Sequence, residues 1–339
     1  MNASDLWESA VKGAKWLASQ QEPDGRWRPL RSPCVDAYYK GSWALNLMGY
    51  PTQAHHCLNY AVRRLLQPNG DLLPRRHLWH REIHYLYANA YFVIGGARTG
   101  RYDVQQPTLA YILSQQRPAS GGFASSPSAE NGAFSCDSMS TAACGLAALA
   151  AGRLDVASCA ARWLANLAKE QPEPDAAFYT TTDAEERLVT SFAEDDAPWR
   201  VVRTDQPDQT WYAVGLPFAF LVKAAQATGQ RSLLALAGWF FDLQERCVNA
   251  WEGPSSGKAG WGCAELYRMT GKARYREVAL QVGAYIAAAQ DASGAWNSDF
   301  GRPVAPDHPF IPQDFDASAE FTLWLGEIAS NLLARERQD

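Results

Sequence analysis

The sequence of 339 residues lacks the features that define several large classes of protein. No apolar run reaches the roughly 18 residues that would predict a membrane span. No cluster of Lys and Arg indicates a nucleic-acid surface, since 31 basic and 36 acidic residues are mixed along the chain. The N-terminal residues show no charged region followed by an apolar one, so we expect a cytoplasmic protein.

Cofactor and metal motifs are lacking as well. The seven cysteines include no C-x-x-C pair and lie mostly in apolar segments, a pattern that does not favour a zinc site built from cysteines. No glycine-rich string resembles a nucleotide- or flavin-binding fingerprint, and no segment alternates with the two-residue period of a strand. We therefore expect an all-α protein without a cofactor or metal.

What the sequence does contain is a repeat. Residues 21–27 read QEPDGRW and residues 290–296 read QDASGAW, so both follow the pattern Q-x-x-x-G-x-W. Between them, helical patterns end in a glycine and a new helical pattern begins within about four residues, as in tight helical hairpins. These helix-ending glycines are Gly49, Gly100, Gly152, Gly229 and Gly271.

Apolar periodicity predicts twelve helices that form six hairpins. Their expected ranges are 4–20, 37–48, 52–67, 82–99, 104–116, 137–151, 154–170, 209–228, 231–246, 259–270, 273–289 and 315–335. A linear solenoid would leave an apolar face exposed on the first and the last helix. We therefore expect one domain, residues 1–339, folded as an (α/α)6 toroid of six inner and six outer helices and closed by pairing of the first and last helices.

The Q-x-x-x-G-x-W strings, together with a G-G-F string at residues 121–123, resemble repeats of the terpenoid cyclase and protein prenyltransferase toroid superfamily. The resemblance implies scaffold roles for Gln21, Trp27, Gln290 and Trp296. Class II cyclases of this superfamily carry D-x-D-D, in which the middle Asp protonates an alkene. The string DFDAS at residues 314–318 keeps two of the three acids, which makes Asp316 a candidate proton donor. The zinc ligands of the prenyltransferases have no clear counterpart here.

Polar residues concentrate where the inner helices are expected to begin, while the later turns are apolar. Six helix N-termini would meet there and create a positive potential at the mouth of the ring. The candidate catalytic residues at this mouth are Asp316, His84, Glu320, Asp137 and Lys40. The candidate substrate-binding residues are Asp36, Tyr39, Trp43, His80, Tyr85, Trp211, Tyr212, Lys258, Trp261 and Asp314. Helix capping is the alternative role for several of the Asp residues.

Two groups within this set have spacings that suit acid–base chemistry. His77, His80 and His84 would share one face of a helix, and a role in proton transfer is favoured over a metal site because His titrates near neutral pH. His84 lies deepest of the three. Asp316 and Glu320 are one helical turn apart, so their pKa values could split and leave one carboxyl protonated. A solvated or Lys-paired face is the alternative for these two acids.

Two further features remain as alternatives. Cys136 lies at the expected start of an inner helix, a position that lowers the pKa of a thiol and permits a nucleophilic role. The segment 172–208 is long and poorly periodic, and we interpret it as a lid over the mouth, with Trp199 and Arg200 as possible contacts.

These observations favour a metal-free acid–base enzyme that acts on a small organic substrate as a cyclase, isomerase or lyase. The first alternative is a carbohydrate-active enzyme, such as a six-hairpin glycosidase, a uronate lyase or a sugar epimerase, because a polar mouth suits a polar substrate. The second alternative is a non-catalytic binding scaffold. A fold of this kind does not by itself distinguish these functions.

Overall fold

The computed structural model describes residues 1–76, 83–127, 134–301 and 308–337, and in them the predicted helical ring is confirmed. The inner helices are α2 (Gly41–Leu47), α5 (Leu86–Thr99), α7 (Ser138–Ala150), α10 (Tyr212–Thr228), α12 (Gly257–Thr270) and α14 (Pro312–Glu336). The outer helices are α1 (Ala3–Ser19), α3 (Pro51–Arg64), α6 (Tyr102–Ser114), α8 (Leu154–Lys169), α11 (Arg231–Glu245) and α13 (Ala273–Ala288).

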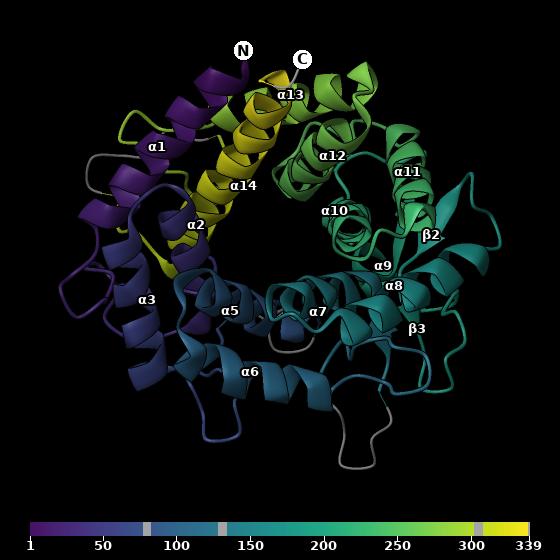
Figure 1. Cartoon of the computed structure of the whole chain (residues 1–339), viewed down its shortest axis with the longest axis horizontal. Helices are drawn as coiled ribbons and strands as arrows, with labels where there is room; N and C mark the ends of the chain where they lie inside the picture. Colours follow the sequence, from purple (N-terminus) through teal and green to yellow (C-terminus); the bar gives the residue numbers. More distant parts are fainter. Residues whose placement is uncertain (77–82, 128–133, 302–307, 338–339) are drawn as a thin grey trace.

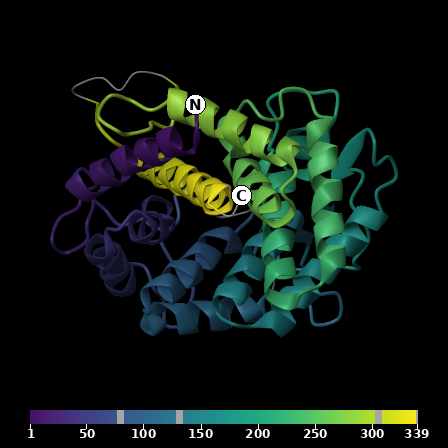
Figure 2. The same cartoon turned by 45° about the horizontal axis from the view of Figure 1, so that its top comes forward.

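Figure 1 looks down the ring and shows the inner helices arranged around its axis. Each inner helix packs against its two inner neighbours, from α2 through α5, α7, α10 and α12 to α14 and back to α2. The ring closes where α1 packs along α14, and Figure 2 shows the same two helices side by side from a second direction. The predicted closure by the first and last helices is therefore confirmed.

Glycines terminate the hairpins as predicted. Gly49, Gly100, Gly152, Gly229 and Gly271 all have positive φ, between 69° and 82°. This left-handed conformation reverses the chain after the helix at little steric cost to glycine. Most outer helices are amphipathic, so their apolar faces pack on the inner ring.

The Q-x-x-x-G-x-W strings have structural contacts. Gln290 Nε2 donates to the carbonyls of Ser9 (3.0 Å) and Gly294 (2.9 Å), which joins the last loop to α1. Gly294 has φ +95°, and a Cβ there would lie 2.6 Å from the carbonyl oxygen of Lys12. The indole of Trp296 is buried and donates to the carbonyl of Ile286 (2.9 Å). The motif therefore ties each long loop to a neighbouring outer helix.

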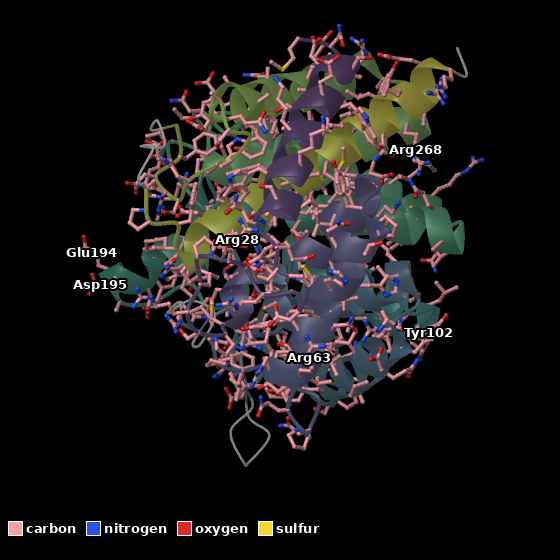
Figure 3. The ribbon with its side chains drawn as sticks, turned by 90° about the vertical axis from the view of Figure 1, so that its left-hand side faces the viewer. Arg28, Arg63, Tyr102, Glu194, Asp195 and Arg268 are labelled. Atoms are coloured by element: carbon pink, nitrogen blue, oxygen red, sulfur yellow. The ribbon has the colours of Figure 1, made fainter. Side chains whose placement is uncertain are left out.

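Four short strands are a correction to the expectation of none. β1 (Cys136–Asp137) pairs with β3 (Thr181–Thr182), and β2 (Ala177–Tyr179) pairs with β4 (Val201–Arg203), both antiparallel. Two or three residues are too short for their alternation to be recognised in a sequence. Three of the strands belong to the segment 172–208, which also contains α9 (Ala197–Arg200). Figure 3 shows Glu194 and Asp195 of this segment pointing outward near the face where α14 begins, with Arg268 near the opposite face.

Among the described residues, none of the helices combines the length and the apolar character needed to span a lipid bilayer.

Candidate active site

A cavity of about 440 Å³ lies at the mouth of the ring, among the first turns of the inner helices. All six inner helices, or the residues just before them, contribute to its wall. Seven of the predicted site residues line it: Tyr39, Lys40, His84, Tyr212, Lys258, Asp316 and Glu320. The residues brought together in this cavity come from positions 39 to 321 of the chain.

Charged side chains on one wall form a continuous chain. Lys40 Nζ lies 2.8 Å from Asp316 Oδ1 and also binds Glu320 Oε2. Lys258 Nζ binds the other oxygen of Glu320, Oε1. The Tyr39 hydroxyl donates to Asp316 Oδ2 (3.1 Å). Two ammonium groups and two carboxylates therefore alternate along the wall, and Tyr39 ends the chain.

The lysines keep Glu320 ionised. Burial alone would raise the pKa of the Glu320 carboxyl, but the charges of Lys258 and Lys40 and their hydrogen bonds outweigh it and hold that pKa far below the ordinary value. Burial also disfavours the charged form of Lys40, yet Asp316 and Glu320 leave its pKa raised. Glu320 is therefore the ionised member of the pair. The alternative of Lys-paired carboxylates is met by Lys40 and Lys258.

His84 lines the cavity from the residues just before α5 and is held by Asp137. Its Nδ1 lies 2.9 Å from Asp137 Oδ1. Asp137 caps α7 and also accepts from the Ser140 backbone N–H (2.8 Å) and hydroxyl (2.6 Å). Burial would raise the pKa of Asp137, but His84 and Ser140 leave it lowered. An ionised carboxylate only accepts hydrogen bonds, so Nδ1 of His84 carries a proton.

The other ring nitrogen of His84 is available for chemistry. Nε2 is buried and has no hydrogen-bond partner, and His84 lines the cavity. The His84 backbone has φ +53°, a left-handed conformation that a non-glycine residue adopts at some energetic cost. The ring of Tyr212 packs against the imidazole at right angles, with 5.7 Å between the ring centroids. These contacts fix the orientation of the imidazole in the cavity wall.

The helix expected at 82–99 begins at Leu86, so His84 is not helical. The expectation that a helical face aligns it with His77 and His80 is therefore not met at His84, and those two histidines lie outside the described residues. Within the parts of the chain that the structure describes, no group of three His, Cys, Asp or Glu side chains could hold a metal ion.

Two predicted substrate-binding residues lie deeper than the cavity. Trp43 and Trp261 pack with Trp324 in a cluster whose ring centroids are 5.3–6.1 Å apart. Trp43 and Trp261 line a second cavity, of about 460 Å³, among the later turns of the inner helices. The cations there are neutralised by carboxylates: Arg98 by Glu327 (3.1 Å), and Lys223 by Glu265 (3.1 Å). The three indoles thus lie between the two cavities.

Asp36 and Asp314 are buried supports outside the cavity wall. The Asp36 carboxylate accepts from the Arg76 backbone N–H (2.8 Å). Asp314 accepts from the backbone N–H groups of Ser298 and Ile311, both at 2.8 Å, and lies 3.0 Å from a ring nitrogen of His308. These carboxylates anchor loops at the mouth of the ring. Of the two acids in the string that resembles D-x-D-D, only Asp316 lines the cavity.

Tyr85 and Trp211 also lie outside the cavity wall. The Arg75 guanidinium stacks on the Tyr85 ring, 3.6 Å from its centroid, and the Tyr85 hydroxyl donates to Asp71. Trp211 is buried, and its indole lies 3.6 Å from the position of a Cβ at Gly253. Both residues pack against loops between the helices and so have structural contacts.

The alternative roles for Cys136 and for the segment 172–208 gain no support. Burial raises the pKa of the Cys136 thiol to about 12, which opposes the expected effect of the helix N-terminus. Cys136 also does not line the cavity, so a nucleophilic role gains no support. No residue of 172–208 lines the cavity, Trp199 and Arg200 included. A lid function for this segment stays a prediction.

Several cavity residues were missed in the sequence. These are Tyr87, Met139, Asn297, Phe300, Gln313 and Phe321. Tyr87 could have been recognised from its spacing, because Tyr91 follows it by four residues, which places both on one face of a helix. Their hydroxyls are 3.0 Å from each other. Asn297 and Phe300 follow the last Q-x-x-x-G-x-W motif in a loop, where no periodicity indicates which side chains point inward.

No protein-family model matches the chain, and no curated protein matches it in sequence. Solved structures do match it. A D-mannose isomerase superposes with a TM-score of 0.69 at 11% identity, over 97% of both chains. A GH76 alpha-mannanase of Bacteroides thetaiotaomicron has a TM-score of 0.64 at 12% identity, over 98% of this chain and 97% of its own. A type II terpene cyclase from Scytonema, in complex with geranylgeranyl dihydroxybenzoate, has a TM-score of 0.56 at 13% identity, over 97% and 98%.

At these identities the likeness concerns the fold. It confirms the all-α toroid fold. The similar structures bear the names of an isomerase, a glycosidase and a cyclase, so the fold is shared by enzymes of three reaction types. The reaction has to be argued from the side chains in the cavity.

Proposed function

We propose that this protein is a metal-free acid–base enzyme that removes a proton from the carbon next to a carbonyl group of a small, polar substrate, as an isomerase or a lyase. The observation that carries the proposal is His84 in the cavity wall, whose buried Nε2 has no hydrogen-bond partner while Asp137 holds Nδ1. A nucleophile or base oriented by a third group in this way is a recurring arrangement in catalysis.

The lysine–carboxylate wall complements this base. When His84 takes the proton, negative charge develops on the carbonyl oxygen, and an ammonium group of Lys40 or Lys258 stabilises it by a charge-assisted hydrogen bond. Return of the proton to the neighbouring carbon gives an isomer. Loss of a group from the next carbon gives the product of a lyase. The volume of about 440 Å³ lies in the lower part of the range of small-molecule sites.

This proposal moves the first proton transfer from Asp316 to His84. Asp316 is already bound by Lys40, at 2.8 Å, and by the Tyr39 hydroxyl, at 3.1 Å. Nε2 of His84 has no such partner, so enolisation through His84 is proposed in preference to cyclisation through Asp316. Asp316 instead orients Lys40 and accepts hydrogen bonds from substrate hydroxyls. A substrate of the carbohydrate class fits this polar wall.

The test is exchange of substrate hydrogen with solvent. Sugars, hydroxyketones and keto acids are incubated with the enzyme in D2O, and loss of the signal of the hydrogen next to the carbonyl is followed by proton NMR. We expect exchange with the wild type, also in the presence of EDTA, and a loss of about 10²- to 10⁴-fold in His84→Asn. Asn tolerates the left-handed backbone of position 84.

His55→Asn on the outer helix α3 is the matched control and should exchange like the wild type. Equal exchange by a folded His84→Asn variant would overturn the role of His84. Absence of exchange from the whole panel would contradict the proposed reaction.

A further inference from the structure

Lys258 differs from the other lysine of the cavity in its surroundings. It lies in the first turn of α12 and is 3% exposed. Its ammonium group faces three aromatic rings, with Nζ 5.4 Å from the centroid of Tyr87, 5.5 Å from Tyr212 and 5.6 Å from Trp324. Its one carboxylate partner is Glu320. Lys258 therefore has an apolar environment on most sides.

The charges around the two lysines are unequal. Lys40 binds both Asp316 and Glu320, whereas Lys258 shares Glu320 with Lys40. The charged groups that act on Lys258 are Glu320 and the more distant Asp316, both on α14, and the like charge of Lys40 before α2. From α5 and α10, the phenol rings of Tyr87 and Tyr212 face the ammonium group. Burial, with a smaller contribution from Lys40, lowers the pKa of Lys258 despite Glu320, while the pKa of Lys40 is raised.

We propose that Lys258 is a nucleophile that forms an imine with the carbonyl group of the substrate. Lysines act in this way where they are desolvated or lie beside another cation. The neutral Nζ attacks the carbonyl carbon, a C–N bond forms, and the π electron pair moves to the oxygen. A proton passes from nitrogen to that oxygen to give a carbinolamine. A second proton on the oxygen allows the C–O bond to break, which releases water and leaves a protonated imine.

His84 is placed to serve this intermediate. Both His84 and Lys258 contact the ring of Tyr212. The centroid of the His84 ring lies 5.7 Å from the Tyr212 centroid, and Lys258 Nζ lies 5.5 Å from it. A protonated imine withdraws electrons from the neighbouring C–H bond more strongly than a carbonyl group does, so His84 Nε2 would remove that proton more readily. The inference deepens the proposed function at the same site, but it stands on the surroundings of Lys258 and can fail separately.

The test uses formaldehyde, the smallest carbonyl compound, so that no substrate has to be known. Formaldehyde forms an imine with any accessible neutral amine, and cyanoborohydride then transfers hydride to the imine carbon to leave an N-methyl group. The folded wild-type protein is labelled briefly between pH 6 and 9, and methylation of each lysine is measured by peptide mass spectrometry. Lys272, exposed before α13, is the control.

We expect Lys258 to be methylated faster than Lys272 at pH 7, because a lowered pKa raises the neutral fraction of the amine. The variant Glu320→Gln, which removes the counter-ion, should extend this reactivity to lower pH. Methylation of Lys258 at or below the rate of Lys272 throughout the pH range would overturn the proposal.

The His84→Asn variant distinguishes the two proposals. Loss of solvent exchange with unchanged methylation of Lys258 supports both. Rapid methylation together with absent solvent exchange in the wild type contradicts the proposed function alone. Normal exchange together with slow methylation contradicts the role of Lys258 alone and leaves both lysines as hydrogen-bond donors.

Discussion

At the scale of single residues, the chemistry of the cavity depends on how each titratable group is paired. Lys40 is paired with the carboxylates of Asp316 and Glu320, and Asp137 sets the orientation of His84. Among these paired groups, the buried nitrogen without a partner is Nε2 of His84, a residue of the cavity wall. A base needs an available lone pair, so this contrast assigns the role better than the identity of the residues does.

Asp137 provides a test of this assignment, because its capping and orienting roles can be separated. Asn caps helices as well as Asp does, so Asp137→Asn should keep the bond from the Ser140 N–H and change the melting temperature by only a few degrees. It removes the charge that holds a proton on His84 Nδ1. We expect solvent exchange to fall about 10²-fold or more.

The control is Asp155→Asn, since Asp155 lies in the first turn of the outer helix α8 and is paired with Arg153 at the surface. Its exchange rate should match that of the wild type. If Asp137→Asn exchanged at the wild-type rate as well, the contact with His84 would be structural. Asp137→Ala, which loses the cap, should unfold earlier than Asp137→Asn.

At the scale of helices and loops, the glycine of the long-loop motif has a role that differs from that of the helix-ending glycines. Gly25 has φ +89°, and a Cβ there would lie 2.0 Å from the carbonyl oxygen of His56 on α3. Gly49 has φ +82° and open space around its Cβ position. Gly70 and Gly121 repeat the close approach of Gly25, to the carbonyls of Pro107 and Cys159. The degenerate copies of the motif thus keep the same contact.

Substitution by alanine should distinguish the two classes. Both Gly25→Ala and Gly49→Ala incur the left-handed penalty of about 1–2 kcal/mol. Gly25→Ala also forces α3 and the loop apart, which costs about 1–3 kcal/mol more. Urea unfolding should therefore show a lower midpoint for Gly25→Ala than for Gly49→Ala. Equal midpoints would mean that the loop moves freely from α3.

The helices could be predicted from the sequence because their signals are local. Apolar periodicity and a terminal glycine act within one helix, so the ranges agree to within a few residues. The cavity could be predicted only in part. His84 is held in a left-handed conformation. The helix that was expected to contain His84 and Tyr85 begins only at Leu86. Tyr85 packs on Arg75 rather than in the cavity.

The cavity also depends on pairing between residues far apart in the sequence, which local signals do not contain. Lys40 and Glu320 are separated by 280 residues, and their contact exists only because the ring closes. The sequence therefore permits lysine pairing of Asp316 and Glu320 but does not identify Lys40 and Lys258 as the partners. The depth of Trp43 and Trp261 had the same origin, since it depends on where each helix begins along the axis of the ring.

At the scale of the whole molecule, contacts between inner helices close the ring, but the chain does not connect its last inner helix to its first. Adjacent inner helices are linked through the sequence at every position except between α14 and α2, where α1 bridges by packing along α14. The candidate site spans this seam, because Lys40 lies before α2 while its carboxylate partners lie on α14. The geometry of the cavity therefore depends on closure.

Gly13 lies on α1 at this seam, where a Cβ would be 2.2 Å from Thr322 Oγ1 and 2.7 Å from the ring of Trp296. Gly13→Ala should destabilise the protein by about 1–3 kcal/mol through overpacking. Gly238→Ala on the outer helix α11 is the matched control, since its nearest neighbour would be the Tyr275 hydroxyl at 3.8 Å. There the gain in helix propensity should stabilise by about 0.5–1 kcal/mol.

The two substitutions therefore have opposite expected signs, and the form of the transition carries further information. In a closed ring every inner helix depends on two neighbours, so the loosened seam should lower the midpoint of one cooperative transition in urea. Circular dichroism and tryptophan fluorescence should then give the same midpoint in Gly13→Ala. A separate early transition would show instead that the hairpins unfold as a solenoid does, with nearest-neighbour coupling only. In that case the seam, and the ion pairs of Lys40 across it, would open before the rest of the ring.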